Sequence, residues 1–198
     1  MFYNCTALTS FTSDSSGSPV NLSKMTNGKY MFYGCDNLKS FNADLSSLTI
    51  GNHMFYSCDK LTTFSSNLSN LTDGNHMFYN CAQLTSFSSD LSSLTNGYCM
   101  FSYCPLTSFN ANLSSLTNGE WMFENNTNLK SFNSNLRSLT DGKYMFNGCS
   151  SLTDFNADLG SLEDGRWMFY NCKLTTTSLE KIADTIKDVR DLGKLPDG

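Results

Sequence analysis

The sequence predicts an α/β repeat solenoid: a right-handed coil of eight repeats of about 23 residues with short parallel strands, followed by a C-terminal capping helix. Three observations predict this fold. Met-Phe pairs recur at residues 1, 31, 54, 77, 100, 122, 145 and 168. Cys, Leu, Phe and Gly follow each pair at fixed distances, and the pattern ends near residue 177, where a helical periodicity replaces it.

The full repeat reads M-F-x-x-C-x-x-L-x-x-F-x-x-x-L-x-x-L-x-x-G-x-x and organises residues 1–177 as one solenoid domain. An insertion at residues 15–21 lengthens the first copy, and the fifth copy, "CPLTSF", lacks one residue that "CAQLTSF" has. One such unit has too few apolar side chains to fold alone, so neighbouring units must stack and bury the same side chains over one another.

Each repeat is expected to contain two strands and two turns. Asn-Gly or Asp-Gly pairs, such as Asn27-Gly28, favour a turn with a positive φ at the glycine. One strand is predicted directly after each glycine, as over residues 28–32, and a second over residues 38–43. The "MFYNC" segments would then form the corner between them, and successive coils would stack roughly 4.8 Å apart.

The two ends of the array differ. Residues 178–198 form the predicted capping helix and tail, with a capping box between Thr177 and Glu180. An apolar stripe at helical spacing would cover the last coil: Leu179, Ile182, Ala183, Ile186 and Val189. The first repeat begins without a cap, so we expect a fragment of a longer protein whose first coil is covered by upstream sequence, by a partner chain, or by end-to-end self-association.

Seven of the eight cysteines share one slot of the repeat, and only Asn126 replaces them there. These residues are Cys5, Cys35, Cys58, Cys81, Cys104, Cys149 and Cys172. A regular coil does not readily supply the dihedral angle of a disulfide, so a column of small, buried, free thiols is the favoured interpretation.

The charge composition of the chain makes some classes of binding partner unfavourable. The net charge is −5 and the pI is near 4.8, which disfavours nucleic acid and anionic membrane surfaces. No stretch approaches the length of an apolar membrane span, and residues 1–30 lack the pattern of a secretory signal, so a soluble chain with any export signal outside it is expected. No cofactor is expected.

"MFYGCDNLKSFNADLSSLTIGNH" and its copies resemble the BspA-like leucine-rich repeats of bacterial surface proteins. The tail "LTTTSLEKIADTIKDV" is similar to segments that end such arrays in gut bacteria and their prophages. The resemblance implies a leucine-rich-repeat solenoid, an extracellular, cell-surface or virion location, adhesion to a host or microbial surface protein or glycan, and no enzymatic activity. Met replaces the usual Ala before the Phe, and the Pro that often ends the strand is missing.

The candidate binding residues form a column directly before each Met, which we call the aromatic ladder. Its members are Tyr30, His53, His76, Cys99, Trp121, Tyr144 and Trp167. Beside it runs a polar column: Lys29, Asn52, Asn75, Tyr98, Glu120, Lys143 and Arg166. Stacked rings with polar neighbours suit sugars or the hydrophobic side chains of a protein partner. The alternative is cross-strand pairing that only stabilises the coil.

Two other chemistries have weaker support. His53, His76 and Cys99 lie on successive repeats and would approach one zinc ion, but a linear ladder does not supply tetrahedral geometry. Asp44, Asp90 and Asp158 share a slot with Asn67, Asn112 and Asn135, and an amide cannot replace a catalytic carboxylate. That slot is therefore expected to stabilise a turn.

The sequence thus favours a non-enzymatic binding or adhesion module that recognises a protein or glycan through exposed ladders. The alternative is a structural spacer or fibre segment of a surface or phage tail protein.

Overall fold

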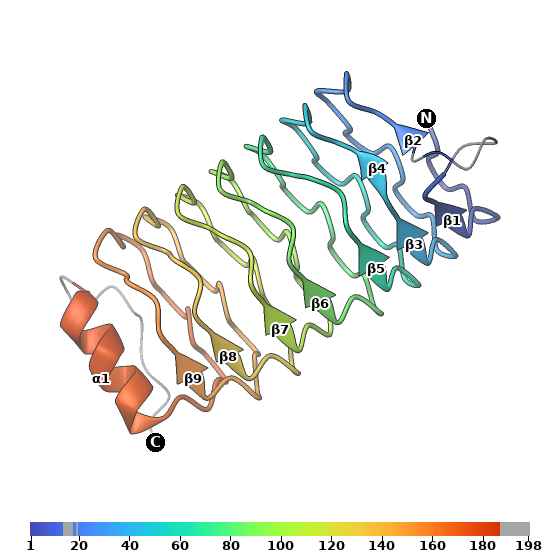
Figure 1. The fold of residues 1–198 in the computed structure, drawn as a ribbon. Helices are drawn as coiled ribbons and strands as arrows, with labels where there is room; N and C mark the ends of the chain where they lie inside the picture. Colours follow the sequence, from blue (N-terminus) through green and yellow to red (C-terminus); the bar gives the residue numbers. More distant parts are fainter. Residues whose placement is uncertain (14–17, 19, 187–198) are drawn as a thin grey trace.

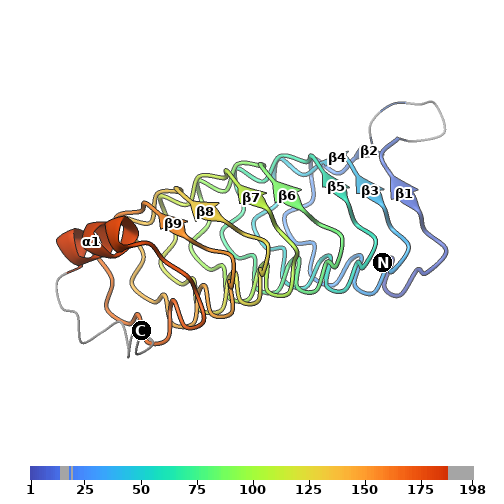
Figure 2. The same ribbon diagram turned by 90° about the horizontal axis from the view of Figure 1, so that it is seen from below.

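A computed structural model describes residues 1–13, 18 and 20–186 of the chain. Figures 1 and 2 show an elongated coil whose rungs lie side by side along one axis, with a single helix at the C-terminal end. The described strands follow one side of this coil. Most of the inserted segment at 15–21 lies outside the described residues.

The strands are short and parallel. They are β1 (Ser10–Phe11), β2 (Val20–Asn21), β3 (Ser40–Phe41), β4 (Ala43–Asp44), β5 (Thr63–Phe64), β6 (Ser86–Phe87), β7 (Ser108–Phe109), β8 (Ser131–Phe132) and β9 (Asp154–Phe155). β1, β3 and β5 form one sheet, while β2 pairs with β4, β6 with β7, and β8 with β9. The strand predicted over 38–43 is therefore present in shorter form, as β3 and β4.

Like side chains lie over like side chains, as predicted. The rings of Phe32, Phe55 and Phe78 stack with centroids 5.4 Å apart at both steps. A second column of Phe comes from the strands, and its rings meet the first column edge to face, as between Phe32 and Phe41 at 5.1 Å. The core thus consists of two columns of Phe with Met, Leu and Cys packed around them.

The strand predicted over residues 28–32 is wrong, because the segment between each glycine and the next cysteine folds as a series of turns. We call this segment the corner. Its alternate residues donate backbone hydrogen bonds to the next rung, as Gly51, His53, Phe55 and Ser57 do to Asp73, Asn75, Met77 and Tyr79. From Gly28 onward, four such bonds join every pair of successive corners. The corner therefore holds the rungs together without forming strands.

The glycine that begins the corner has a packing role from Gly28 to Gly142, and the prediction of a positive φ at the Asn-Gly and Asp-Gly pairs is wrong. Only Gly34 and Gly148 have a positive φ among the described glycines. A Cβ atom at Gly28 would lie 2.7 Å from the Sδ atom of Met54 in the next rung, and at Gly51 it would lie 2.7 Å from that of Met77. Glycine is required because the methionine of the neighbouring rung fills this space.

The Asp and Asn residues at the end of each strand stabilise turns, as predicted. Asp44, Asn67 and Asp90 each accept a hydrogen bond from the backbone amide two residues later, at 2.9–3.0 Å. Asn112, Asn135 and Asp158 do the same. Carboxylate and amide oxygens perform this role equally, which explains their exchange along the column.

All the cysteines are free, and those of the repeat slot form the predicted column. The Sγ atoms of Cys58, Cys81 and Cys104 donate to the carbonyl of the Phe that begins the preceding rung, at 3.1–3.2 Å. Burial raises the pKa of the Cys58 and Cys149 thiols far above the usual value. These thiols are therefore protonated and unreactive packing groups.

Asn126 occupies the cysteine slot for a reason that the sequence does not reveal. Its Nδ2 atom donates to the Phe101 carbonyl at 2.8 Å, as the thiols do elsewhere. Its Oδ1 atom accepts from the Leu106 amide at 3.3 Å. In the rungs with two residues between this slot and the Leu, the Leu amide bonds to the carbonyl of the residue in the cysteine slot, as Leu84 does to Cys81. The fifth repeat is one residue short, so Asn126 supplies the acceptor that this rung lacks.

The helix α1 spans Thr176–Thr185, close to its predicted place. Its N-cap is Thr175, whose side chain accepts a hydrogen bond from the Ser178 amide, so the predicted capping box between Thr177 and Glu180 is wrong. Ile182 is buried against the last rung, whereas Leu179 and Ala183 are exposed. Only part of the predicted stripe therefore covers the core. Val189 lies outside the described residues.

Candidate binding surface

The aromatic ladder lies along the corner side of the coil, one residue per rung, and its backbone has an unusual conformation. Every member has a φ between 52° and 60°, in the left-handed region. A second column in this region directly precedes the cysteine slot, and most of its members are Asn or Gly, which favour the conformation: Asn4, Gly34, Asn80, Asn125, Gly148 and Asn171, with Ser57 and Tyr103 as the exceptions. The ladder contains neither Gly nor Asn, so its Tyr and Trp side chains are held at an energetic cost, whereas His tolerates this conformation better.

The ladder consists of two stacks with a break between them. Tyr30, His53 and His76 stack with centroids 4.8 and 4.7 Å apart. Trp121 and Tyr144 stack at 3.8 Å, and Trp167 follows at 6.4 Å with its ring nearly parallel. Cys99 interrupts the column, since it has no ring and is buried. The structure therefore brings six of the seven predicted residues into two ring stacks, while Cys99 packs inside.

A column of tyrosines lies beside the first stack, and sequence reasoning missed it. Tyr3, Tyr33, Tyr56 and Tyr79 stack with centroids 4.8–4.9 Å apart and rings within 9° of parallel. We call this set the tyrosine column. Its signal was in the sequence, because five of the eight Met-Phe pairs continue as Met-Phe-Tyr, and the first four of these supply the tyrosine column.

The two columns touch, so the N-terminal half of the corner side is one aromatic surface. The rings of Tyr30 and Tyr33 lie 5.9 Å apart, those of His53 and Tyr56 5.6 Å, and those of His76 and Tyr79 5.3 Å. We call this combined surface the aromatic face. Tyr3 and Tyr30 are exposed, and the other members are half-buried.

The rings of the aromatic face are neutral near pH 7, although the Lys29 ammonium lies 5.4 Å from the centre of the Tyr30 ring. The pKa of His53 is lowered mainly by burial and to a smaller extent by the positive charge of Lys29. The pKa of His76 is lowered to about 4, mainly by burial and then by the neighbouring His53. Burial and the adjacent Tyr56 raise the pKa of Tyr79 to about 12. Imidazoles and phenols are thus both neutral here.

Charges from the polar column concentrate near the C-terminal stack. Lys143 forms an ion pair with Glu120 at 3.3 Å, and Glu120 also accepts a hydrogen bond from the Trp121 indole. The Arg166 side chain binds both carboxylate oxygens of Asp164, and the hydrogen bond from Arg166 lowers the pKa of Asp164. These charges pair within the molecule and hold the flanks of the stack in place.

The arrangement of His53, His76 and Cys99 does not suit zinc. The two imidazole rings are parallel within 9°, so their nitrogens do not converge. Cys99 is buried, and burial raises the pKa of its thiol to about 11. No three His, Cys, Asp or Glu side chains come together as a metal site among the described residues.

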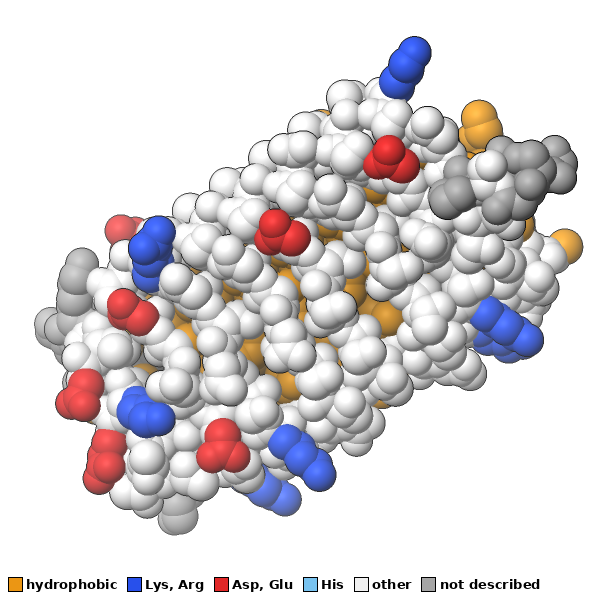
Figure 3. All heavy atoms as spheres, in the orientation of Figure 1, with side chains coloured by type: hydrophobic (Ala, Val, Ile, Leu, Met, Phe, Trp, Pro, Cys, Tyr) orange, Lys and Arg blue, Asp and Glu red, His pale blue; other side chains and the backbone are white. Residues whose placement is uncertain are grey.

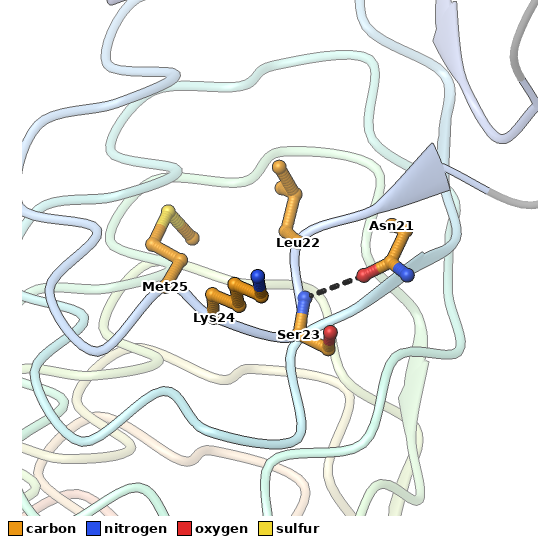
Figure 4. Close-up of a pocket in the computed structure, with 5 residues that line it drawn as sticks. All are labelled: Asn21, Leu22, Ser23, Lys24 and Met25. Carbon is orange, nitrogen blue, oxygen red and sulfur yellow. Dashed lines mark hydrogen bonds between the residues drawn. The ribbon is translucent and has the colours of Figure 1, made fainter.

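Shallow hollows lie elsewhere on the coil. One, of about 510 Å³, is lined by the continuous stretch Asn21–Met25 near the N-terminal end, where the Ser23 amide donates to Asn21 at 2.9 Å (Figure 4). Its side chains do not converge on a common point. Within the described part of the chain, the only helix is too short to cross a bilayer.

Columns of Leu, Phe and Cys that stack rung on rung, with short parallel strands along one side, define a leucine-rich-repeat solenoid. The chain belongs to the BspA-type leucine-rich repeat family, whose six-copy repeat region matches residues 1–130 and 74–189. A leucine-rich repeat protein from T. pallidum is similar in its crystal structure, with 20% identity, a TM-score of 0.43, and coverage of 93% of this chain and 82% of that one. No curated protein matches the sequence.

Proposed function

We propose that the chain is a non-enzymatic binding module of a surface-displayed or virion-associated protein, and that its aromatic face recognises a protein partner. The observation that carries the proposal is the rigid, half-exposed double column of rings formed by the aromatic ladder and the tyrosine column. Tyrosine and tryptophan are enriched among the residues that dominate binding energy at protein interfaces.

The energetics of the ladder support a role beyond stability. A left-handed backbone costs a bulky residue about 1–2 kcal/mol, and an aromatic pair returns about 0.5–1.5 kcal/mol. The two terms nearly cancel, so stacking alone gives little reason to prefer rings over the Asn and Gly of the second left-handed column. A binding function does give such a reason.

The orientation of the rings favours a protein over a sugar at this surface. Rings at 4.7–4.9 Å cover one another's faces, so ring edges and phenol hydroxyls point outward. Sugars stack on exposed ring faces, whereas protein side chains also pack against edges and accept hydrogen bonds from phenols. Each ring is held by two neighbours, so little side-chain entropy is lost on binding.

The test is binding of the purified chain to a panel of host extracellular-matrix and mucosal proteins, followed by variants. Tyr33→Ala with Tyr56→Ala should weaken any specific binding by about 30-fold or more, as expected for two interface anchors. Asn42→Ala with Ser65→Ala, on the strand side, is the matched control and should leave binding unchanged. Binding that survives loss of both tyrosines would refute the proposed surface.

A structural spacer is the second candidate. The continuous corner hydrogen bonds from Gly28 to Tyr170 favour it, because they would make the coil stiff along its axis. A panel without any specific binding, combined with a rod that stays rigid in solution scattering, would favour the spacer over the binding module.

A further inference from the structure

The strand side has two seams where successive rungs are not joined by backbone hydrogen bonds. In paired rungs, the amide before the strand bonds to the preceding rung, as Thr107 does to Thr85 and Thr153 to Lys130. The amide after the strand does the same, as Asn110 does to Phe87 and Asn156 to Phe132. Among the described residues, no such bonds join β5 to β6 or β7 to β8.

The seam between β7 and β8 opens into a hollow of about 260 Å³. Four asparagines line it: Asn110 and Asn112 from one rung, and Asn133 and Asn135 from the next. The buried residues Phe109 and Ala111 line its apolar part. In paired rungs the carbonyl of the strand Phe accepts a hydrogen bond from the amide after the next strand. The strands are not paired here, so the Phe109 carbonyl and the Asn133 amide have no partner among the described residues.

The asparagine side chains are arranged to donate hydrogen bonds. The Oδ1 atoms of Asn112 and Asn135 accept from the amides of Ser114 and Arg137 at 3.0 and 2.9 Å, which fixes both side chains and leaves their NH₂ groups available. Asn110 and Asn133 are exposed, and their side chains have no partner in the described structure. The hollow therefore offers several donors and a free carbonyl acceptor.

One paired step shows how a serine can help to close this space. Between β3 and β5, the Ser66 hydroxyl accepts a hydrogen bond from the Ala43 amide at 3.0 Å, in the slots that Ser134 and Ala111 occupy here. Ser134 makes no such bond to Ala111. The hollow lies at a step where both the strand pairing and this serine bridge are missing.

Charge separates this seam from the rest of the strand side. The column that contains Asn112 and Asn135 has a carboxylate at Asp44, Asp90 and Asp158, whereas two adjacent rungs are neutral here. Figure 3 shows this side covered mostly by uncharged polar atoms, with hydrophobic surface visible between them. A neutral ligand that both donates and accepts hydrogen bonds and has an apolar patch matches this lining best.

We propose that the hollow between β7 and β8 binds one pyranose ring of a neutral glycan. Ring hydroxyls both donate and accept, which matches the asparagine NH₂ groups, the Phe109 carbonyl and the Asn133 amide. The C–H face of the ring matches the apolar part of the hollow. This site lies on the strand side and is separate from the aromatic face, so the two proposals stand or fall independently.

The test is NMR titration of the ¹⁵N-labelled chain with the methyl glycosides of glucose, galactose, mannose and N-acetylglucosamine, each added separately. At least one glycoside should shift the side-chain NH₂ signals of Asn110, Asn112, Asn133 and Asn135 in a saturable way. The expected dissociation constant is on the order of millimolar, as for a small ligand in an open site.

Variants decide whether the hollow is responsible. Asn110→Ala with Asn133→Ala removes two donors that make no structural hydrogen bond, and it should weaken binding by about tenfold or more. Asn42→Ala with Ser65→Ala changes the same slots where the strands are paired, and it should leave binding unchanged. The proposal is overturned by the lack of saturable shifts with all four glycosides, or by equal losses in both variants.

Discussion

The two sides of the coil hold their rungs together in opposite ways. The corner side has no strands, yet four backbone hydrogen bonds join each pair of successive corners from Gly28 onward. The strand side has the secondary structure, yet its pairing stops at two seams. The Phe rings are also closer under the corner, with centroids 5.4 Å apart between Phe55 and Phe78, than under the strands, with 5.9 Å between Phe64 and Phe87.

The comparison shows that the strands are not where the backbone hydrogen bonds between rungs are most continuous in this solenoid. A backbone that alternates between right- and left-handed turns points its amides along the coil axis, and it can pair with the next rung as fully as a strand does. The corner then positions the aromatic face on a continuous support. The strand side remains open enough for a hollow to form between rungs.

Amide hydrogen exchange should show the largest difference between the two sides. The amides of Phe78 and Phe101 bond across corners, and those of Thr85 and Lys130 lie at the seams without a partner in the described structure. We expect the seam amides to exchange at least about 100-fold faster than those of the corner. Thr107, in the same slot but bonded to Thr85, is the internal control and should be protected. Equal protection at all strand amides would contradict the seams.

Loss of a ring should cost more under the corner than under the strands. Phe78→Ala removes a fully buried ring with close neighbours on both sides, and we expect the free energy of unfolding to fall by about 3–5 kcal/mol. Phe87→Ala should cost about 1 kcal/mol less, because its column neighbours are 5.9 and 6.0 Å away and fewer contacts are lost. Urea denaturation measures both. An equal or larger loss for Phe87→Ala would show that the strand side is packed as tightly.

The exception at Asn126 offers a test of how the corner tolerates a shortened repeat. Asn126→Cys keeps a donor to Phe101 but leaves the Leu106 amide without its acceptor, so we expect a loss of about 1–3 kcal/mol. Replacement of Pro105 by Ala-Gln restores the length of the other repeats and should remove most of this loss. A double-mutant cycle of the two changes measures the coupling. Additive effects would mean that the short repeat and Asn126 are unrelated.

The histidines should make the corner sensitive to acid, with the smallest of these effects. Their pKa values are lowered in the folded chain, so the unfolded chain binds more protons below its own histidine pKa of about 6.5. Stability should therefore fall as the pH drops from about 6.5 to about 4. Because both rings are partly exposed, we expect only about 1–2 kcal/mol from the pair.

A double variant isolates the histidine contribution from that of the carboxylates. His53→Tyr with His76→Tyr places in both slots the residue found at Tyr30 and Tyr144 with the same backbone conformation. Between pH 7 and pH 4, the unfolding free energy of the wild type should fall by more than that of this variant, because only the wild type has the two histidines. A difference that does not change with pH would contradict the prediction.

Much of the fold could be predicted, because identical residues at a fixed period must occupy identical environments. The stacking of Phe32, Phe55 and Phe78, the column of free cysteines and the turn role of Asp44 follow from this rule alone. The turns of the corner were not predicted, because each Asn-Gly pair indicates a turn with positive φ at the glycine, followed by a strand. In the structure the glycine is required by the close approach of a methionine instead. Positive φ falls two residues later, at the ladder.

The candidate surface was predicted in part. The ladder residues were found because their column is aromatic, but the sequence does not show that Cys99 turns inward or that the ring faces are covered. The tyrosine column became visible as a surface only when Tyr33 and Tyr56 were found beside Tyr30 and His53. The hollow at the seam depends on hydrogen bonds that are missing, and no residue pattern encodes a missing bond directly.

The sequence by itself determined the repeat, its apolar columns and the dependence of each rung on its neighbours, because these follow from side-chain chemistry at a regular period. The tertiary structure alone decided where the rungs are bonded, which ring faces are covered, and why Asn126 stands in the cysteine slot. Those features depend on differences of a few tenths of an ångström in the spacing of neighbouring rungs. Such differences are set only when all the rungs pack together.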